Sequence, residues 1–135
     1  MKLTEKDKKL IQVASTVIHD NIDLYEKELI VGCALRMKSG KVYTGINIKT
    51  SHSICAEQVA IGQALANGER EFDTIVAVKF DKEGDDRVVS PCGLCRYIMN
   101  DLHMDMNVIV EDIKNGRILK VKASKLLPYP YKRNN

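Results

Sequence analysis

The sequence predicts an α/β fold, a three-layer α/β/α sandwich with a central mixed sheet of five strands. An amphipathic helical pattern comes first, two strand-like segments around a short turn follow, and apolar runs then alternate with helix-like segments. Elements in this order pack as helices on both faces of one sheet. Because 135 residues are enough for one core and too few for two ordinary domains, residues 1–135 are expected to form a single domain.

The N-terminal third of the chain predicts a helix and a hairpin. Thr4 and Asp7 resemble a capping box, and an apolar stripe of helical period follows them. Leu29 to Arg36 and Lys41 to Ile48 have the composition of strands, and Lys38-Ser39-Gly40 between them is typical of a turn. These segments therefore predict one helix followed by an antiparallel pair of strands.

The remaining elements alternate between helix and strand. A helix is expected to open at Cys55 and to stop at Asn67-Gly68, which is a C-terminal helix signal. Thr74 to Val78 is a short continuous apolar run, which indicates a strand buried on both faces. A second helix is expected after Pro91, a residue that suits a helix opening. The last two expected strands are Met106 to Val110 and Ile118 to Val121.

The segment before the second helix is charged. The acidic run from Asp81 to Asp86 is expected to form a solvated loop. Arg87 follows it directly, and it either pairs with that loop or faces a functional site.

Two short motifs carry the chemistry of this chain, Cys55-Ala56-Glu57 and Cys92-Gly93-Leu94-Cys95. Structural zinc sites usually take four protein ligands, whereas catalytic sites take three and keep one position open for water. Three thiols beside a carboxylate therefore favour a catalytic Zn²⁺ site. Cys55, Cys92 and Cys95 are its expected ligands, and Glu57 is the expected catalytic residue that moves protons.

Both motifs are expected at the start of a helix. Cys92 and Cys95 are three residues apart, so they share one face of a helix and both can bind one ion. Three thiolates around Zn²⁺ leave a net negative charge, which the positive ends of two helices can offset. Arg96 is expected to assist by donating a hydrogen bond to a thiolate sulfur.

Two other interpretations of these cysteines stay open. Cys33 or His52 could complete a four-ligand structural site, which would make the chain a zinc-stabilised binding module without catalysis. Cys92 and Cys95 also form a CxxC motif, which redox proteins carry at a helix start. Cys33 lies in an apolar strand, where a buried core thiol is the simpler interpretation. The third cysteine and its paired Glu57 argue against the redox class.

The composition restricts the partners of the chain. The net charge is only +3, and two Phe and no Trp give no basic stripe with stacking aromatic residues, so nucleic acid is not an expected partner. There is no signal peptide and no apolar run that could span a membrane. Four cysteines in a chain of ordinary soluble composition indicate reduced thiols and a cytoplasmic location. A small molecule is the expected substrate.

The motifs resemble those of the small cytidine deaminase family over nearly the whole chain. Gly45-Ile46-Asn47, Cys55-Ala56-Glu57 and Ser90 to Arg96 carry the resemblance. Asp73 to Val78 and Leu126-Leu127-Pro128 are most similar to the blasticidin S deaminase branch. The resemblance implies hydrolysis of the 4-amino group of a cytosine nucleoside, with release of ammonia. It also implies a homotetramer in which neighbouring chains complete the pocket.

The resemblance further implies that Asn47, Ala56 and Tyr131 contact the nucleoside, and for Tyr131 packing of the tail against a neighbouring subunit stays open as the alternative. Asn47 matches the first residue of the family's ribose-binding pair, but Lys49 replaces the Glu that is usually the second. Gln58 replaces an Arg that often follows the catalytic Glu. These departures favour blasticidin S, or a similar modified cytosine nucleoside, over cytidine. Lys49 then either binds the carboxylate of blasticidin S or remains a solvated lysine.

Overall fold

The structure is a computed structural model that describes residues 1–81 and 86–132. Its helices are α1 (Glu5–Asp20), α2 (Ala56–Ala66) and α3 (Gly93–His103), with short 3₁₀ turns η1 (Lys27–Leu29) and η2 (Ala123–Leu126). Its strands are β1 (Val31–Met37), β2 (Val42–Ile46), β3 (Phe72–Lys79), β4 (Arg87–Val89), β5 (Asn107–Asp112) and β6 (Arg117–Lys122).

The strands form one mixed sheet with the order β2-β1-β3-β5-β6, and β4 pairs with β3 outside this path. The β3–β5 pair is parallel, and the other pairs are antiparallel. The sheet therefore has six strands, and the prediction of five was wrong by one. The additional strand is β4, which has only three residues and is too short to show a strand period.

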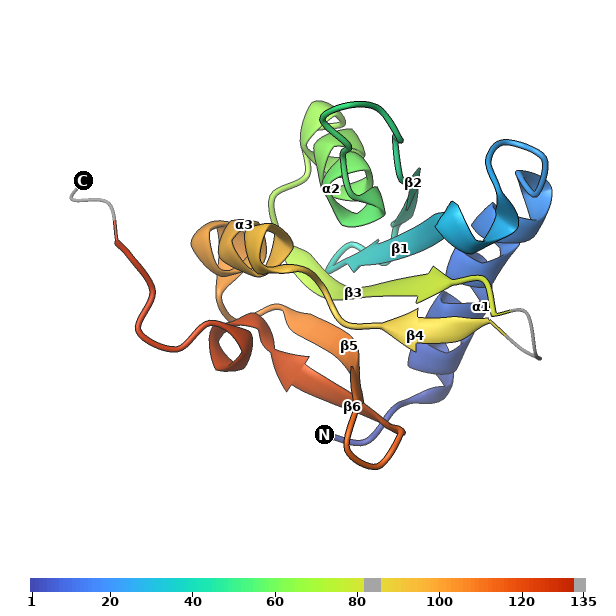
Figure 1. The fold of residues 1–135 in the computed structure, drawn as a ribbon. Helices are drawn as coiled ribbons and strands as arrows, with labels where there is room; N and C mark the ends of the chain where they lie inside the picture. The colour runs from blue at the N-terminus through green and yellow to red at the C-terminus, as the bar shows by residue number, and fades with distance from the viewer. Residues whose placement is uncertain (82–85, 133–135) are drawn as a thin grey trace.

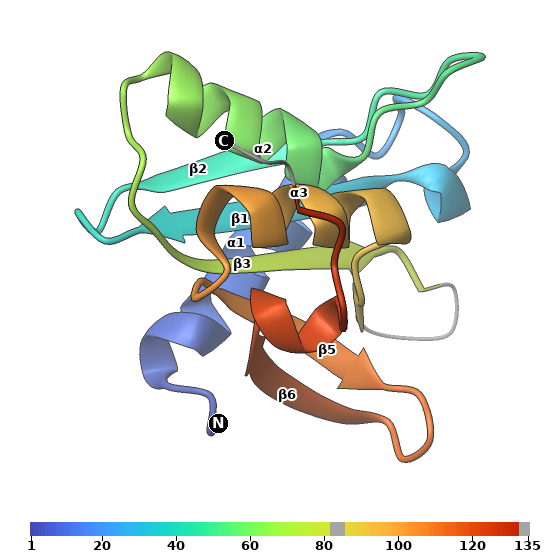
Figure 2. The same cartoon turned by 90° about the vertical axis from the view of Figure 1, so that its left-hand side faces the viewer.

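Helices cover both faces of this sheet, which confirms the three-layer sandwich (Figures 1 and 2). Side chains alternate across a strand, so neighbouring residues enter different cores. Leu35 and Ile75 pack with α2 and α3 on one face, whereas Ala34 and Val76 pack with α1 on the other. The strand β3 is buried on both faces, as its continuous apolar run predicts.

The predicted ends of the elements agree closely with the structure. The side chain of Thr4 caps the N-terminus of α1, and Asp7 completes the capping box. Gly40 in the hairpin turn and Gly68 after α2 both have positive φ, the conformation in which glycine is favoured. Leu29 belongs to η1 rather than to the first strand, which begins two residues later. Most of the acidic run lies at 82–85, outside the described residues.

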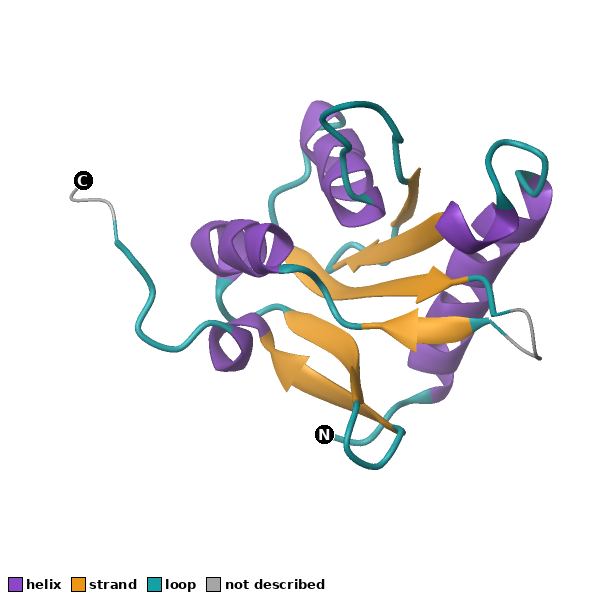
Figure 3. Ribbon diagram, viewed as in Figure 1, coloured by secondary structure: helices purple, strands orange, loops and turns teal. Residues whose placement is uncertain are grey.

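Close packing between β2 and α2 fixes the position of the first cysteine motif. A Cβ atom added at Gly45 would lie 2.3 Å from the carbonyl oxygen of Ala56, so only glycine permits this approach. The helix α2 starts at this contact, directly after Cys55. Beyond η2 the chain continues as a loop that leads away from the sheet (Figure 3). None of the helices described is long and apolar enough to cross a membrane.

Candidate metal centre

The two cysteine motifs meet at the first turns of α2 and α3. Cys55 is the N-cap residue of α2, Cys92 is the N-cap residue of α3, and Cys95 lies in the first turn of α3. The Sγ atoms of these three residues all lie within 4.8 Å of one another. The Sγ atoms of Cys55 and Cys92 are 3.6 Å apart. Cys55 thus forms one compact group of sulfur donors with two cysteines that lie 37 and 40 positions further along the chain.

The separation of 3.6 Å between the Cys55 and Cys92 sulfur atoms fits two ligands of one tetrahedral zinc ion. Zn–S bonds of about 2.3 Å place two thiolates on one ion roughly 3.8 Å apart. A disulfide needs an S–S distance of about 2.05 Å, and all four cysteines are free. Among the described residues, no histidine, carboxylate or fourth cysteine joins the three sulfur atoms. Cys33 lies buried in the core instead, and His52 is exposed in a loop.

Hydrogen bonding at the start of α3 favours the ionised form of Cys92. Burial alone raises the pKa of Cys92, but the backbone N–H groups of Cys95 and Leu94 and the neighbouring thiols outweigh it, so the pKa lies below its ordinary value. Burial instead raises the pKa of Cys55 and of Cys95. The Cys92 thiol therefore ionises more readily than the other two, whose protons a cation nearby would help to displace.

Glu57 lies beside the sulfur atoms and shares a cavity with them. Its side chain is buried, with 6% of the residue exposed, and this burial raises the pKa of its carboxyl. The cavity has a volume of about 260 Å³ and is lined by Cys55, Cys92 and Glu57. Its other walls include Val31, Asn47, Ile54, Ala56, Val89 and Ser90. Glu57 and two of the three sulfur donors therefore border one space.

The sulfur contact predicted for Arg96 is made by another residue. Arg96 Nε donates to the carbonyl oxygen of Pro91 at 2.8 Å, and its Nη1 donates to the carbonyl oxygen of Leu126 at 3.5 Å. Gln58 Nε2 lies 3.5 Å from Cys95 Sγ and donates to it. The expected Arg96–sulfur hydrogen bond was wrong, because the guanidinium is directed to backbone carbonyls around the Cys92 turn.

Comparison with known proteins identifies the family. The model of the cytidine and deoxycytidylate deaminase zinc-binding region matches residues 4–111. The chain belongs to this family.

Full-length relatives agree with the family assignment. The chain is 39% identical over 140 residues to the blasticidin-S deaminase of Bacillus cereus, which covers 98% of this chain and 96% of that protein. It is 37% identical over 102 residues to the cytidine deaminase of Halalkalibacterium halodurans, covering 73% of this chain and 74% of that protein.

Solved structures of the deaminase family share the fold. The crystal structure of cytidine deaminase from Burkholderia pseudomallei has a TM-score of 0.73 and 28% identity, over 96% of this chain and 100% of that chain. The cytidine deaminase from Bacillus anthracis has a TM-score of 0.77 at 20% identity, over 92% of this chain and 88% of that one. At this lower identity, the similarity to the B. anthracis enzyme shows a shared fold and nothing more.

The residues that the family resemblance assigned to the nucleoside are divided between two places. Asn47 and Ala56 line the cavity beside Glu57. The Asn47 side chain accepts from the Val31 N–H at 2.9 Å and donates to the Leu29 carbonyl at 2.8 Å, so part of its hydrogen-bonding capacity is already used. Tyr131 does not line this cavity within its own chain. It is 74% exposed in the tail, near the end of α3.

The structure shows the positions of two basic residues, Arg87 and Lys49, whose roles the sequence did not decide. Arg87 Nη2 lies 2.8 Å from Glu111 on β5, so it forms a strand-to-strand ion pair rather than lining the cavity. Lys49 donates its backbone N–H to the Tyr25 hydroxyl, and its exposed side chain lies outside the cavity lining. Ser90 is a cavity residue that the sequence reasoning missed, although its place directly before Pro91-Cys92 could have indicated it.

Proposed function

We propose that this chain is a zinc-dependent hydrolase that removes the 4-amino group of a cytosine nucleoside. Water replaces the amino group at that ring carbon, and the products are the uracil nucleoside and ammonia. The main support for this proposal is that Cys55, Cys92 and Glu57 line one small cavity, and that Cys95 completes a group of three sulfur atoms. Three ligands rather than four are the mark of a catalytic zinc site.

Each group of the site has a distinct role in this reaction. Cys55, Cys92 and Cys95 would hold Zn²⁺, which lowers the pKa of a bound water from about 15.7 to about 7. Glu57 accepts a proton from water, passes it to the ring nitrogen beside the amino-bearing carbon, and later supplies a proton to the departing ammonia. Burial of Glu57 excludes bulk water from these transfers.

Arg96 acts as a positioning residue in this proposal. Its hydrogen bond to Pro91 holds the turn that carries Cys92, and its second bond joins this turn to the end of η2 at Leu126. Gln58 supplies the neutral donor to the Cys95 sulfur. Partners of this kind orient metal ligands and set their basicity.

The preferred substrate is proposed to be blasticidin S or a similar modified cytosine nucleoside. The similarity to a blasticidin-S deaminase extends over 98% of the chain, whereas the similarity to the H. halodurans cytidine deaminase covers 73%. Lys49 stands where the family's ribose-binding Glu is usual, and its exposed ammonium suits a carboxylate on the sugar. This assignment makes antibiotic resistance the physiological role, and pyrimidine salvage is the alternative if cytidine is preferred.

A homotetramer is proposed because the cavity of one chain is small. At about 260 Å³ it is below the usual range of roughly 300 to 1,000 Å³ for ligand sites, so a large nucleoside needs additional walls. An apolar groove between α2 and α3, lined in part by Ile61, Leu65 and Ile98, offers a surface for another chain. Tyr131 of a neighbouring tail would then reach the nucleoside.

The remaining assignments follow from the same site. We propose that residues 1–135 act as one zinc-dependent deaminase domain, because the two cores share a single sheet. We also propose a cytoplasmic location, since the three thiols must stay reduced to bind zinc.

The deciding experiment measures ammonia release and ultraviolet absorbance with cytidine, deoxycytidine, cytosine, their phosphates and blasticidin S. Wild-type protein is expected to deaminate at least one nucleoside, with the highest kcat/KM for blasticidin S. Glu57→Gln is expected to keep one zinc per chain and to lose activity by about 10²-fold or more. Glu71→Gln, at an exposed residue that does not line this cavity, is the matched control and should keep its activity.

Each negative outcome has a definite meaning. Zinc retention without ammonia release from any substrate would favour the zinc-stabilised binding module. A strong preference for cytidine would overturn the blasticidin S assignment and leave the deaminase proposal standing. A monomer by light scattering would refute the homotetramer.

A further inference from the structure

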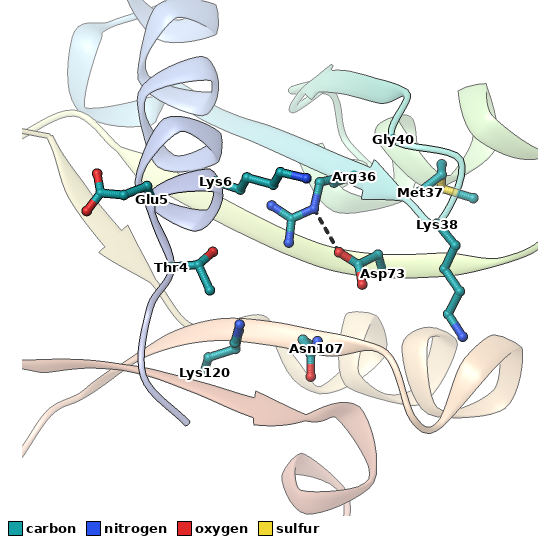
Figure 4. Close-up of a pocket in the computed structure, with 10 residues that line it drawn as sticks. All are labelled: Thr4, Glu5, Lys6, Arg36, Met37, Lys38, Gly40, Asp73, Asn107 and Lys120. Carbon is teal, nitrogen blue, oxygen red and sulfur yellow. Dashed lines mark hydrogen bonds and ion pairs between the residues drawn. The ribbon is translucent and has the colours of Figure 1, made fainter.

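A second cavity lies at the opposite end of the sheet from the sulfur cluster. Its volume is about 610 Å³, and Arg36 and Met37 at the end of β1 line it, whereas Val31 at the start of β1 lines the catalytic cavity. At about 3.3 Å per strand residue, the two sites are roughly 17 Å apart along β1. Figure 4 shows side chains from α1, β1, the hairpin turn and β6 around it.

The inner wall of this cavity is built from buried charges. Asp7, which is fully buried, accepts from Lys120 Nζ at 2.7 Å and from Arg36 Nη2 at 2.9 Å. Arg36 Nε also donates to Asp73 at 2.7 Å. The side chain of Lys120 is only 10% exposed, and its ammonium points into the cavity (Figure 4).

Donors on this wall outnumber acceptors. Two buried atoms of cavity-lining residues have no hydrogen-bond partner within the described residues: the donor Arg36 Nη1 and the acceptor Asn107 Oδ1. One of the three N–H groups of Lys120 is bound to Asp7, and no other partner is found for that ammonium in the described part of the chain. Buried donors without partners are costly, so a wall of this kind favours an acceptor-rich ligand.

The rim of the cavity adds two further cations. Lys6 and Lys38 are exposed, and within residues 1–81 and 86–132 neither side chain forms an ion pair. Glu5 also borders the cavity, but it pairs with Lys8 at 3.2 Å and points away from the space (Figure 4).

The charges around the cavity therefore favour an anion. Four basic side chains face it, whereas the carboxylates that remain near it are Asp7 and Asp73, both already bound to Arg36. Two positive charges are left without a compensating acid. The first turn of α1 does not supply this attraction, because Thr4 and Asp7 already cap it.

We propose that this cavity is a binding site for a phosphoryl group. Lys6, Lys38 and Lys120 belong to different elements and approach the space from different sides (Figure 4). A tetrahedral oxyanion presents oxygen atoms in several directions and can accept from all three, whereas a planar carboxylate presents only two oxygens. The site is separate from the metal centre and is independent of the deaminase proposal.

The test is calorimetric titration of inorganic phosphate into the zinc-loaded protein at constant ionic strength, with chloride as the reference salt. Wild-type protein is expected to bind one phosphate per chain saturably. The double variant Lys6→Gln/Lys38→Gln, which changes only exposed side chains, should weaken this affinity at least about tenfold. The matched control Lys9→Gln/Lys27→Gln removes the same charge from exposed residues outside the cavity and should bind phosphate like the wild type.

The other results would overturn the proposal. No saturable binding beyond that of chloride, or an equal loss in both double variants, would show general surface attraction. Glycerol 3-phosphate and vesicles of phosphatidylcholine with phosphatidic acid distinguish a soluble from a lipid source of the phosphoryl group. Binding of either through Lys6 and Lys38 supports the site, and binding of neither contradicts it. Deamination rates should be equal in both double variants, since neither pair touches the catalytic cavity.

Discussion

Gln58 gives the sulfur cluster a neutral hydrogen-bond donor. Its Nε2 lies 3.5 Å from Cys95 Sγ, on the first turn of the helix that also carries Glu57. An amide stabilises a thiolate less than a guanidinium does, so the sulfur keeps more of its negative charge. The Cys95 thiolate therefore depends on the metal and on Gln58 together.

Replacing Gln58 should loosen the metal. Gln58→Leu keeps a similar size and removes the donor, so we expect zinc transfer to a chelator to become about 10 to 100 times faster. Gln63→Leu is the matched control, since this exposed residue of the same helix is remote from the sulfur atoms. Equal chelation rates in wild type and Gln58→Leu would show that the hydrogen bond has no influence on the metal.

The chemistry of the site could be predicted from residue types and spacing. Cys92 and Cys95 share a helix face because they are three residues apart, and Cys55 joins them because it starts the other helix on the same side of the sheet. The direction of the Arg96 guanidinium could not be predicted. It depends on where the Pro91 and Leu126 carbonyls lie, which packing between distant segments decides.

At the scale of elements, the contact between β2 and α2 sets the geometry of the first motif. Gly45→Ala would place a Cβ atom 2.3 Å from the Ala56 carbonyl oxygen and 2.7 Å from the Ala60 nitrogen, so the helix must move. We expect a loss of about 1 to 3 kcal/mol in the free energy of unfolding, together with a lower zinc content. Thermal unfolding and metal analysis measure both effects.

Gly62→Ala supplies the control on the same helix. Within the single chain a Cβ atom at Gly62 meets nothing within 4 Å, and alanine is favoured over glycine in a helix by up to about 1 kcal/mol. This variant should be as stable as the wild type or more stable, with full zinc content. If Gly45→Ala behaved like Gly62→Ala, the close approach would not position the motif.

The long periodic elements were predictable, and the shortest one was not. The stripe of α1 and the apolar run of β3 give clear periods, and both elements occur where the sequence places them. The strand β4 has three residues and exists because the end of β3 offers it an edge. Pairing of this kind is a tertiary effect that a short segment does not reveal.

At the scale of the whole molecule, Asp7 joins α1, β1 and β6 through Arg36 and Lys120. Burial alone raises the pKa of Asp7, but hydrogen bonds from Lys120, the Thr4 backbone and Arg36 outweigh it and hold the pKa well below its ordinary value of 3.8. Because the pKa of Asp7 is lower in the folded than in the unfolded protein, its ionised carboxylate stabilises the fold fully at any pH above the unfolded-state pKa. This stabilisation is lost as the pH falls below about 4 toward the folded pKa.

Asp7→Asn should therefore lower the free energy of unfolding strongly at neutral pH and less strongly in acid. Removing the Asp7 carboxylate leaves the buried Lys120 ammonium without an acid and leaves Arg36 paired with Asp73 alone, which costs about 3 to 5 kcal/mol at pH 7. Urea unfolding between pH 7 and pH 3 is expected to show the difference from wild type shrinking below about pH 4. Asp20→Asn, at the exposed end of α1, should stay within about 0.5 kcal/mol of wild type throughout. A difference for Asp7→Asn that is independent of pH would contradict the ion-pair account.

X-ray absorption at the zinc edge of the wild-type protein tests the central claim most directly. Three cysteine ligands predict three sulfur neighbours at about 2.3 Å and one oxygen or nitrogen neighbour at about 2.0 Å. That result leaves a place for water beside Glu57, as hydrolysis requires. Four sulfur neighbours, or fewer than three, would contradict a catalytic zinc held by Cys55, Cys92 and Cys95.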